Sequence, residues 1–537
     1  MKKRILLSGF GVVIMSVALL TGCGNDSTNG QDLGLTDVSF PLEEQASLTI
    51  MSPIPPLAPE DPNDFLIFQR LEQETNVNIE WTALTDEAFS ERRNLAIASG
   101  DLPDVIWNSG LNAHELQQMG NDGAIIPLEN IIENYMPNLQ DLLTQNPEYR
   151  AMITNEDGHI WAFPWIEELG AGKESIHSVA GLPWINIEWL DNLGLEMPTT
   201  TNELKEVLIA FRDQDPTGIG IDVIPMSFML DSGAEDMTFL FSAFGLGDND
   251  DWTVVTNNRE VIFTGAEEGY KEGIEFMHEL FVEGLIDIEV FDQDWNRYAA
   301  KGSENLFGLF FAWDKNNIVL TPESYAIMPP LANSNGEINV TRSNGFGFDR
   351  GRAVMTSTNQ NIELTARWMD LMYRPIQSAQ NNWGTFGDEA QQNIFEFDEA
   401  ANMLRHLPLG STPPGELRQR TAVGGPLAIL DRHYGVYTTM PDNAALRLDI
   451  LHEYMVPHIT ANYNFPPVLF TIHELQRLAD IEANLFPYAR RMRAEWIMNG
   501  NIGEEWDDYL QELDRLGLQE WLEIRQAGFE RFMEIQG

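Results

Sequence analysis

The side chains able to do covalent chemistry are few and scattered in this chain. The sequence has 1 cysteine and 9 histidines, and it contains none of the patterns Gly-x-Ser-x-Gly, His-Glu-x-x-His or Gly-x-x-x-x-Gly-Lys. Those patterns place a nucleophile, a zinc ion or a nucleotide phosphate. Asp and Glu number 83, so a carboxylate pair for glycoside hydrolysis could be drawn almost anywhere, and only geometry would single one out. The residue types favour binding over catalysis, and we expect that the protein is not an enzyme.

The only cysteine, Cys23, ends a segment typical of a secretory signal. A positive region at residues 2–4 precedes an apolar run at residues 5–20, which at about 16 residues is shorter than the roughly 20 that span a membrane. The sequence LTGC at residues 20–23 resembles a bacterial lipobox, which implies that the cysteine carries lipid, such as palmitate, and becomes the new amino terminus. We predict a signal peptide at residues 1–22 and a lipid anchor at Cys23. The alternative is a soluble secreted protein with a free thiol.

Composition limits the partners. With 32 basic against 83 acidic residues, the formal net charge is −51, which disfavours nucleic acid because phosphate backbones are bound by clusters of Lys and Arg. The same charge keeps the body of the protein off anionic lipid. At 537 residues and 43% hydrophobic content, the chain is too long for one core and predicts two or more packed lobes.

Alternating strands and helices predict βαβ units and a mostly parallel sheet in the first part of the chain. Residues 24–45 are rich in Gly, Asn, Ser, Thr and Asp and predict a flexible tether. Hydrophobic periodicity then indicates strands at residues 48–51, 77–81 and 104–107, with helices at residues 64–74 and 87–98 between them.

A second α/β region follows, and the chain ends in helices. The patterns predict a strand at residues 182–187, a helix at 200–211, a hairpin at 252–263 and a helix at 267–283. Apolar runs at residues 306–311 and 345–356 predict strands that return to the first sheet. Helical periodicity covers residues 472–485, 488–499, 504–516 and 519–535, with breaks at Pro487, Gly500 and Gly517.

Several phrases together resemble bacterial extracellular solute-binding lipoproteins of the carbohydrate type, which feed ABC importers in Gram-positive bacteria. The clearest is NLAIASGDLPDVI at residues 94–106. Others are GAIIPL at 123–128, YMPNL at 135–139, DG at 157–158, WLDNLGL at 189–195, PTT at 198–200, EGLID at 283–287, WIMNG at 496–500, and Glu505, Trp506 and Tyr509. The resemblance runs from about residue 46 to the C terminus.

The resemblance implies an α/β, two-lobed, periplasmic-binding-protein-like (Venus flytrap) fold with a helical C-terminal region and a ligand between the lobes. We expect a lipidated Cys23 and tether at residues 23–45, and a first lobe that begins at residues 46–164. Residues 165–304 begin the second lobe, residues 305–375 return to the first, and residues 376–537 complete the second lobe and the C-terminal helices. Strand ends of two facing lobes make a cleft, and closure about a hinge buries the ligand.

A cleft that binds sugars needs aromatic platforms and side chains with paired donors and acceptors. The 14 tryptophans are numerous enough to supply them. Trp189, Trp368, Trp496 and Trp506 lie in helical patterns and are expected in the core. The predicted ligand-binding residues lie at strand ends or in loops, and they are Trp107, Asn108, Trp165, Trp184, Asn186, Trp313, Asp314, Asn382 and Trp383.

Residues 213–222, DQDPTGIGID, lie where many relatives resemble a calcium loop. Such a loop needs oxygen ligands at alternate positions and a glycine at the turn. Asp213, Asp215 and Asp222 remain, but Thr217 and Ile219 stand where relatives have asparagine. Calcium at the three aspartates is therefore a weak expectation, no other cofactor is expected, and a turn that ends a helix is the alternative.

These observations lead to one hypothesis. The protein is a lipid-anchored receptor on the extracellular face of the cell membrane, and as a monomer it captures an oligosaccharide and delivers it to the permease subunits of an ABC importer. The acidic surface favours a neutral glycan, although Arg342, Arg350 and Arg352 could form a basic patch that reverses this. A peptide or another small polar solute is the second ligand candidate. An adhesin, a sensor component or a secreted glycoside-active enzyme is the alternative function.

Overall fold

The computed structural model describes residues 38–155, 157–170, 174–408, 410, 412–459, 461 and 463–536. The predicted signal peptide and Cys23 lie outside these residues. The described end of the predicted tether is packed against the body: the Val38 N–H donates to Glu363 Oε1 at 3.1 Å, and the Leu42 N–H donates to Thr75 O at 2.9 Å. Val38, Phe40 and Leu42 alternate along the chain and contact the core of the first lobe. The packed body therefore begins before residue 46, where the sequence predicts that it begins.

A six-stranded mixed sheet, in the order β14-β4-β11-β3-β1-β2, organises the first lobe. Strands β1, β2 and β3 are parallel, as the βαβ pattern predicts, and β14 is parallel to β4, whereas β11 is antiparallel to both of its neighbours. The strands are β1 (Ala46–Pro53), β2 (Val77–Leu84), β3 (Val105–Trp107), β4 (Phe163–Glu167), β11 (Phe348–Met355) and β14 (Leu427–Ile429).

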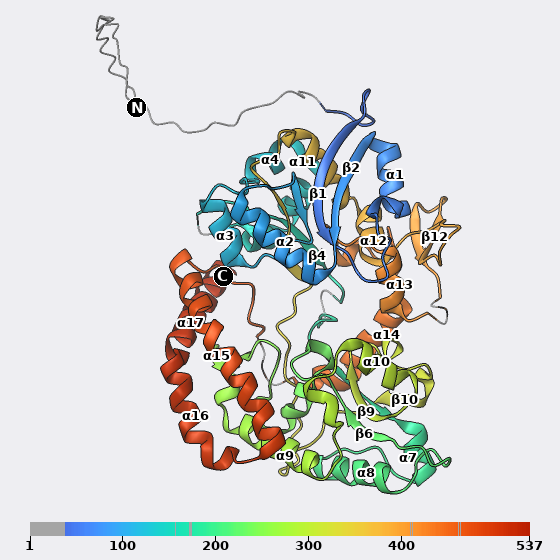
Figure 1. The fold of residues 1–537 in the computed structure, drawn as a ribbon, viewed down its shortest axis with the longest axis vertical. Helices are drawn as coiled ribbons and strands as arrows, with labels where there is room; N and C mark the ends of the chain where they lie inside the picture. The colour runs from blue at the N-terminus through green and yellow to red at the C-terminus, as the bar shows by residue number, and fades with distance from the viewer. Residues whose placement is uncertain are drawn as a thin grey trace, which may run out of the picture. The chain divides into compact units, whose positions relative to one another are not determined.

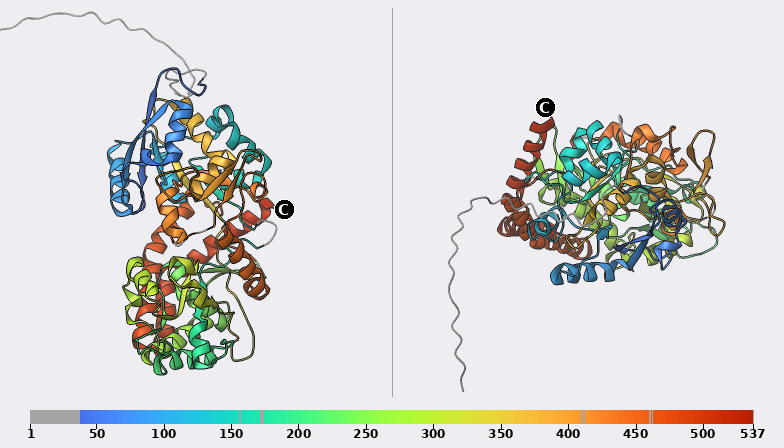
Figure 2. Two further views of the ribbon diagram at one scale, coloured as in Figure 1. Left: turned by 90° about the vertical axis from the view of Figure 1, so that its right-hand side faces the viewer. Right: turned by 90° about the horizontal axis from the view of Figure 1, so that it is seen from above.

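Helices from two distant parts of the chain cover this sheet, so blue and orange segments lie together in Figures 1 and 2. A capping box between Asn112 and Glu115 begins α3, and Asn76 in the left-handed region ends α1. The helices are α1 (Leu66–Thr75), α2 (Asp86–Ser99), α3 (Ala113–Asn121), α4 (Glu129–Tyr135), α5 (Pro137–Gln145), α6 (Pro147–Ile153), α11 (Ile362–Asp370), α12 (Pro375–Trp383) and α13 (Pro414–Thr421). A small hairpin, β12 (Phe395–Asp398) and β13 (Met403–His406), packs near α12.

A four-stranded sheet, in the order β10-β5-β9-β6, organises the second lobe. The strands are β5 (Leu182–Asn186), β6 (Ile224–Ser227), β9 (Phe307–Ala312) and β10 (Tyr325–Ile327). The prediction that the strand near residues 306–311 returns to the first sheet is wrong, because β9 pairs with β5 and β6. All of its residues are apolar and buried, so no alternation indicates which sheet it joins. Only β6 and β9 are parallel here, so the mostly parallel sheet expected from the sequence is confined to the first lobe.

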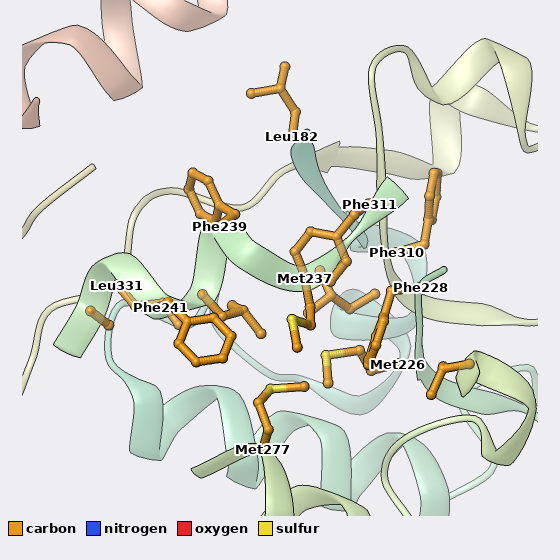
Figure 3. Packing of buried hydrophobic residues seen from close by; sticks show 14 of the residues in the cluster. Leu182, Met226, Phe228, Met237, Phe239, Phe241, Met277, Phe310, Phe311 and Leu331 are labelled. Atoms are coloured by element: carbon orange, nitrogen blue, oxygen red, sulfur yellow. The ribbon is translucent and has the colours of Figure 1, made fainter. Parts of the chain in front are cut away.

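The second lobe is held by a core rich in methionine and phenylalanine. Figure 3 shows Met226, Met237 and Met277 pointing toward one another below Phe311 and beside Phe241. The surrounding helices are α7 (Ile187–Leu193), α8 (Thr201–Asp213), α9 (Glu268–Val282), α10 (Trp295–Ser303) and α14 (Asp442–Ile450), and the predicted hairpin forms as β7 (Thr253–Val255) and β8 (Val261–Phe263). The helical tryptophans assigned to the core by the sequence are buried: Trp189, Trp368, Trp496 and Trp506.

Three long helices end the chain: α15 (Ile472–Asn499), α16 (Ile502–Leu516) and α17 (Leu518–Gln536). The break expected at Pro487 does not occur, because α15 continues through it. A proline inside a helix costs about 3 kcal/mol or more, and burial of Leu485, Ala489 and Met492 around it offsets that cost. In the part of the chain that the structure describes, no helix is long and apolar enough to cross a membrane.

The chain passes between the two sheets three times over the described residues. The crossings join β4 to β5, β10 to β11 and β14 to α14. Because β14 pairs with β4, the chain from residue 376 to Ile429 belongs with the first sheet, whereas the sequence assigns it to the second lobe. The three-residue strand β14 is too short for its pattern to reveal its partner.

The two lobes also touch outside the crossings. The Gly415 N–H at the start of α13 donates to Asn317 Oδ1 beside β9 at 2.9 Å, and α3 contacts α15.

Candidate functional site

A cavity of about 370 Å³ lies where the ends of β4 and β9 face the crossing segments. We call it the cleft cavity. Trp165 and Glu167 come from β4, Trp313 follows β9, and Trp383 ends α12. Since α13 and α14 supply further walls, both lobes contribute to one enclosed space, as the sequence predicts for a cleft at strand ends.

Each of the three tryptophans in the cleft cavity has an arginine over its ring. The guanidinium carbon lies 5.3 Å from the ring centroid for Arg352 over Trp165, 3.6 Å for Arg447 over Trp313, and 4.8 Å for Arg418 over Trp383. Such cation–π contacts orient the ring. They leave at most one face of each half-buried ring for a ligand, which suits the flat apolar face of a sugar.

Arg447 of α14 also fixes the frame of the cleft cavity. Its guanidinium donates to four backbone carbonyls, those of Ile176, Val179, Ala180 and Trp313. Burial lowers its pKa to about 9, so it is charged at neutral pH. One buried cation therefore joins the first crossing segment to the loop that carries Trp313.

Glu167 places a buried carboxylate in the wall of the cleft cavity. Asn382 Nδ2 donates to its Oε1 at 2.6 Å, and His177 Nε2 lies 3.4 Å from its Oε2. Burial opposes ionisation of Glu167, but the nearby imidazole of His177 and the charge of Arg418 together hold its pKa below the usual value. The cleft cavity thus contains an ionised acceptor, which can take hydrogen bonds from hydroxyl groups.

Three buried polar atoms of residues that line the cleft cavity have no hydrogen-bond partner among the described residues: His177 Nε2, Trp383 Nε1 and His406 Nε2. Burial lowers the pKa of His406 to about 4, so its imidazole is neutral at neutral pH. Buried polar groups almost always have partners. Ligand hydroxyls or water would supply them here.

A second cavity, of about 250 Å³, adjoins the first. Trp165 and Arg418 line both. We call it the first-sheet cavity, because its walls come from segments of the first lobe. It includes Trp107, Asn108, Asn382 and Arg352. Asn108 is held by the Gly425 N–H, which donates to its Oδ1 at 2.8 Å.

The structure divides the predicted ligand-binding residues into three groups. Trp165, Trp313, Asp314 and Trp383 line the cleft cavity. Trp107, Asn108 and Asn382 line the first-sheet cavity, although Trp107 is only 1% exposed.

Trp184 and Asn186 line neither cavity, and both have structural roles. Trp184 is 4% exposed and donates to Ala312 O at 3.2 Å, and Asn186 is 2% exposed and caps α7 by accepting from the Trp189 N–H. Both lie in β5, whose residues are all buried. Their position near the end of a strand therefore does not place them in the wall of either cavity.

Sequence reasoning missed Glu167, His177, Arg418 and Arg447. A signal existed only for Glu167, which is an acidic residue in an otherwise apolar strand. The arginines lie in helices more than 30 residues from the tryptophans they cover, and no spacing rule connects them. The expected basic patch is dispersed: Arg342 pairs with Glu174, Arg350 donates to Pro467 O, and Arg352 stacks on Trp165.

The aspartates in residues 213–222 have partners within the protein. Asp213 pairs with Arg212, and Asp215 accepts from the Thr217 hydroxyl and from the N–H groups of Gly218 and Gly220. The described residues contain no group of three or more acidic, histidine or cysteine side chains able to hold a metal. The segment forms a hydrogen-bonded turn at the end of α8.

Comparison with known proteins gives a consistent result. Residues 45–379 match the family described as bacterial extracellular solute-binding protein. The fructooligosaccharide ABC transporter substrate-binding protein FusA of Streptococcus pneumoniae serotype 4 is 52% identical over 534 residues, which are 99% of each chain. The structure of S. pneumoniae FusA in complex with kestose has a TM-score of 0.89 at 53% identity, and the match covers 91% of this chain and 99% of that one. An EF-hand mutant of FusA in complex with fructo-nystose gives the same values.

Proposed function

The chain belongs to the bacterial extracellular solute-binding proteins, and from that premise we propose that it captures an oligosaccharide in the cleft cavity and delivers it to an ABC importer. One observation carries the proposal. Three arginine-backed tryptophans and an ionised carboxylate line one cavity that both lobes build. Aromatic faces bind the apolar faces of sugar rings, and a carboxylate accepts from their hydroxyl groups.

The ligand class that we propose is a neutral fructooligosaccharide. FusA, a protein described as a fructooligosaccharide-binding component, shares 52% of its residues with this chain. The two carboxylates that line the cleft cavity, Glu167 and Asp314, are matched by two guanidinium groups, Arg418 and Arg447. The cavity therefore offers no excess of positive charge to an anionic sugar, and a uronic acid oligomer should bind no more tightly than a neutral one.

No covalent step is part of this function. A glycoside hydrolase needs one protonated carboxylic acid with a raised pKa, whereas the pKa of Glu167 is lowered. Asp314, the other carboxylate in the cleft cavity, accepts from the Asn316 N–H at 2.9 Å and from Asn443 Nδ2 at 3.0 Å. Glu167 is therefore not prepared to protonate a leaving oxygen.

We propose that Cys23 holds the protein to the outer face of the membrane through lipid. The proposal rests on the signal pattern, the LTGC sequence at residues 20–23 and the absence of a second cysteine. Anchoring keeps the local concentration of a loaded receptor near the permease high. Replacing Cys23 by Ala should release the protein into the medium without changing its affinity, and retention of the variant on the cell surface would contradict the anchor.

The oligomeric state, the lobe motion and the metal content are also part of the proposal. We propose a monomer whose two lobes rotate about the crossing segments, with no calcium at Asp213, Asp215 or Asp222. FusA has an EF hand according to the description of its mutant, whereas Asp213 and Asp215 of this chain have partners within the protein.

Isothermal titration calorimetry against kestose, longer fructooligosaccharides and unrelated glycans, with product analysis of the same samples, tests the function. We expect saturable binding of a fructooligosaccharide without shortened products. Trp313→Ala and Trp383→Ala should each weaken binding by about tenfold or more, with Trp295→Ala, an exposed tryptophan outside both cavities, as the matched control. Released shorter sugars would contradict the receptor function, and unchanged affinity in both cleft variants would contradict the site.

A further inference from the structure

A third cavity, of about 590 Å³, lies where α15 passes the start of α3. Its other walls are the crossing segment that enters β11, the loop at residues 465–470 and α17. We call it the α15 cavity. Among the described residues, none lines both this cavity and the cleft cavity or the first-sheet cavity. Its volume lies within the range of roughly 300–1,000 Å³ that is usual for small-ligand sites, so it is a separate candidate site, outside the space where we place the oligosaccharide.

Arg525 of α17 lines the α15 cavity and lacks hydrogen-bond partners. Its guanidinium carbon lies 3.9 Å from the ring centroid of Phe465 and 4.6 Å from that of Trp521, so two aromatic rings fix its position. Its buried Nε has no hydrogen-bond partner among the described residues, and its Nη1 lies 4.0 Å from Glu482 Oε1, which is beyond hydrogen-bond distance. The packing therefore holds this guanidinium in place and leaves its donors for another acceptor.

A buried arginine that has carboxylate partners behaves differently. Arg493 of α15 contacts Asp236 at 2.6 Å and Asp248 at 3.5 Å. Burial opposes its charge, but the carboxylates around it raise its pKa above the ordinary value. For Arg525 the balance is reversed: burial lowers the pKa to about 10, and the more distant Glu482 does not compensate. The α15 cavity therefore contains a cation whose loss of water is not balanced by the protein.

Arg350 of β11 is a second cation in the wall of the α15 cavity. Among the described residues its hydrogen bonds are limited to one, in which Nη2 donates to Pro467 O at 2.9 Å, and burial lowers its pKa to about 10. The carboxylates nearby already have partners: Asp349 accepts from a backbone N–H at 2.8 Å, and Glu482 accepts from Trp521 Nε1 at 2.9 Å. They also disfavour a doubly charged anion, because like charges repel. A ligand with one negative charge fits this balance.

We infer that the α15 cavity binds a small monocarboxylate with an apolar body, whose carboxylate accepts from the unpaired donors of Arg525. A carboxylate matches the planar fork of a guanidinium, and an apolar body gains by covering apolar wall. The site is separate from the proposed function, which needs no second ligand. The apolar part of the wall comes mainly from Leu111, Phe348, Pro466, Val468, Phe470 and Leu475.

Two substitutions test the site in different ways. Arg525→Met removes the donors and keeps an apolar stem against the two rings. Ala479→Phe fills the cavity from an exposed position of α15, so the protein core is not altered. The matched controls are Ala483→Phe, at an exposed alanine of α15 that does not line the cavity, and Arg477→Met, whose guanidinium pairs with Glu520 at 2.7 Å. Thermal unfolding of each variant checks that it folds.

Isothermal titration calorimetry measures binding, with phenylacetate and octanoate as the probes. For the wild-type protein we expect a Kd of about 1 mM or lower. Phenylethanol, which lacks the charge, and acetate, which lacks the apolar body, should each bind about tenfold more weakly or worse. Arg525→Met and Ala479→Phe should each weaken the binding of phenylacetate by about tenfold or more, and both control variants should bind it as the wild type does.

Three outcomes overturn the site. The wild-type protein could bind neither carboxylate, it could bind phenylethanol as tightly as phenylacetate, or either Arg525→Met or Ala479→Phe could leave the affinity for phenylacetate unchanged. Kestose titrated into the same samples reports on the proposed function separately, because the α15 cavity and the cleft cavity share no described residue.

Discussion

The cleft cavity and the first-sheet cavity share their chemistry but differ in how they are assembled. The first takes Trp165 from one lobe and Trp313 from the other, while the second takes every wall from the first lobe. The proposed rotation about the crossing segments would change distances in the cleft cavity and leave the first-sheet cavity intact. The geometry of the cleft cavity therefore depends on the relative position of the lobes, whereas that of the first-sheet cavity depends only on packing within the first lobe.

The largest expected effect distinguishes the two arginines that serve these cavities. Arg447→Met should lower the free energy of unfolding by about 3 kcal/mol or more, because four carbonyls lose a charged donor. Arg352→Met should lower it by no more than about 1 kcal/mol, since its only ion pair is half exposed. Urea denaturation of both variants measures the difference, and equal losses would contradict the distinct role of Arg447.

The next effect tests the ionised wall of the cleft cavity. Glu167→Gln should weaken oligosaccharide binding by about 10- to 100-fold, because hydrogen bonds to charged groups contribute about 1.5–3 kcal/mol. Asp349→Asn is the matched control, since this carboxylate lines neither of the two cavities. Calorimetry gives both affinities. A Glu167→Gln variant that binds as tightly as the wild type would remove Glu167 from the site.

A pH series separates the cleft carboxylate from other buried acids of the second lobe. Burial raises the pKa of Glu235 to about 7 and that of Asp248 to about 6. These acids take up protons first in the folded state, so they stabilise the fold as pH falls from about 8 to 5, and this gain exceeds the opposite effect of His406, whose pKa is lowered to about 4. We expect the midpoint of thermal unfolding to increase by a few degrees over this range.

Two controls accompany the pH series. Asp248→Asn should flatten the dependence of stability on pH, because it removes one of the titrating groups. Oligosaccharide affinity should stay constant from pH 8 to 5, because the lowered pKa of Glu167 keeps it ionised. Its contribution to binding is lost only when the pH falls through its folded pKa, which lies below the ordinary value of 4.5. A thermal midpoint that falls steadily from pH 8 to 5 would contradict the raised pKa values.

A smaller effect is expected at the contact between the lobes. Asn317→Ala removes the acceptor of the Gly415 N–H, one hydrogen bond with a net contribution of about 1 kcal/mol. Ligand dissociation, measured by stopped-flow fluorescence, should become about fivefold faster. An unchanged dissociation rate would contradict a role of this contact in holding the lobes together.

No effect is expected from calcium removal. Asp215 is satisfied by its own turn, so EDTA should change neither the midpoint of thermal unfolding nor the oligosaccharide affinity. Differential scanning calorimetry with and without calcium measures this. A stabilisation by calcium that Asp215→Ala abolishes would reverse the conclusion.

The sequence predicts the architecture better than the walls of the site. Alternating strands and helices predict β1 to β3 and their helices because the period of apolar residues changes clearly between 2 and 3.6. The location of β9 could not be predicted, since a strand that is buried on both faces has no face pattern. Trp165, Trp313 and Trp383 were predicted because sugar chemistry selects aromatics near strand ends. The arginines that cover them come from β11, α13 and α14, far from these tryptophans along the chain, and only the folded structure brings them there.

The first described residues carry a mechanical consequence. The Val38 N–H donates to Glu363 Oε1, and the Arg367 Nε donates to the same oxygen at 2.8 Å, so the chain enters the body on α11. If Cys23 is held by lipid, any pull along the chain reaches the body at α11 of the first lobe. The crossing segments are then outside the path of that tension, and the second lobe is the free end that rotates without dragging the anchor.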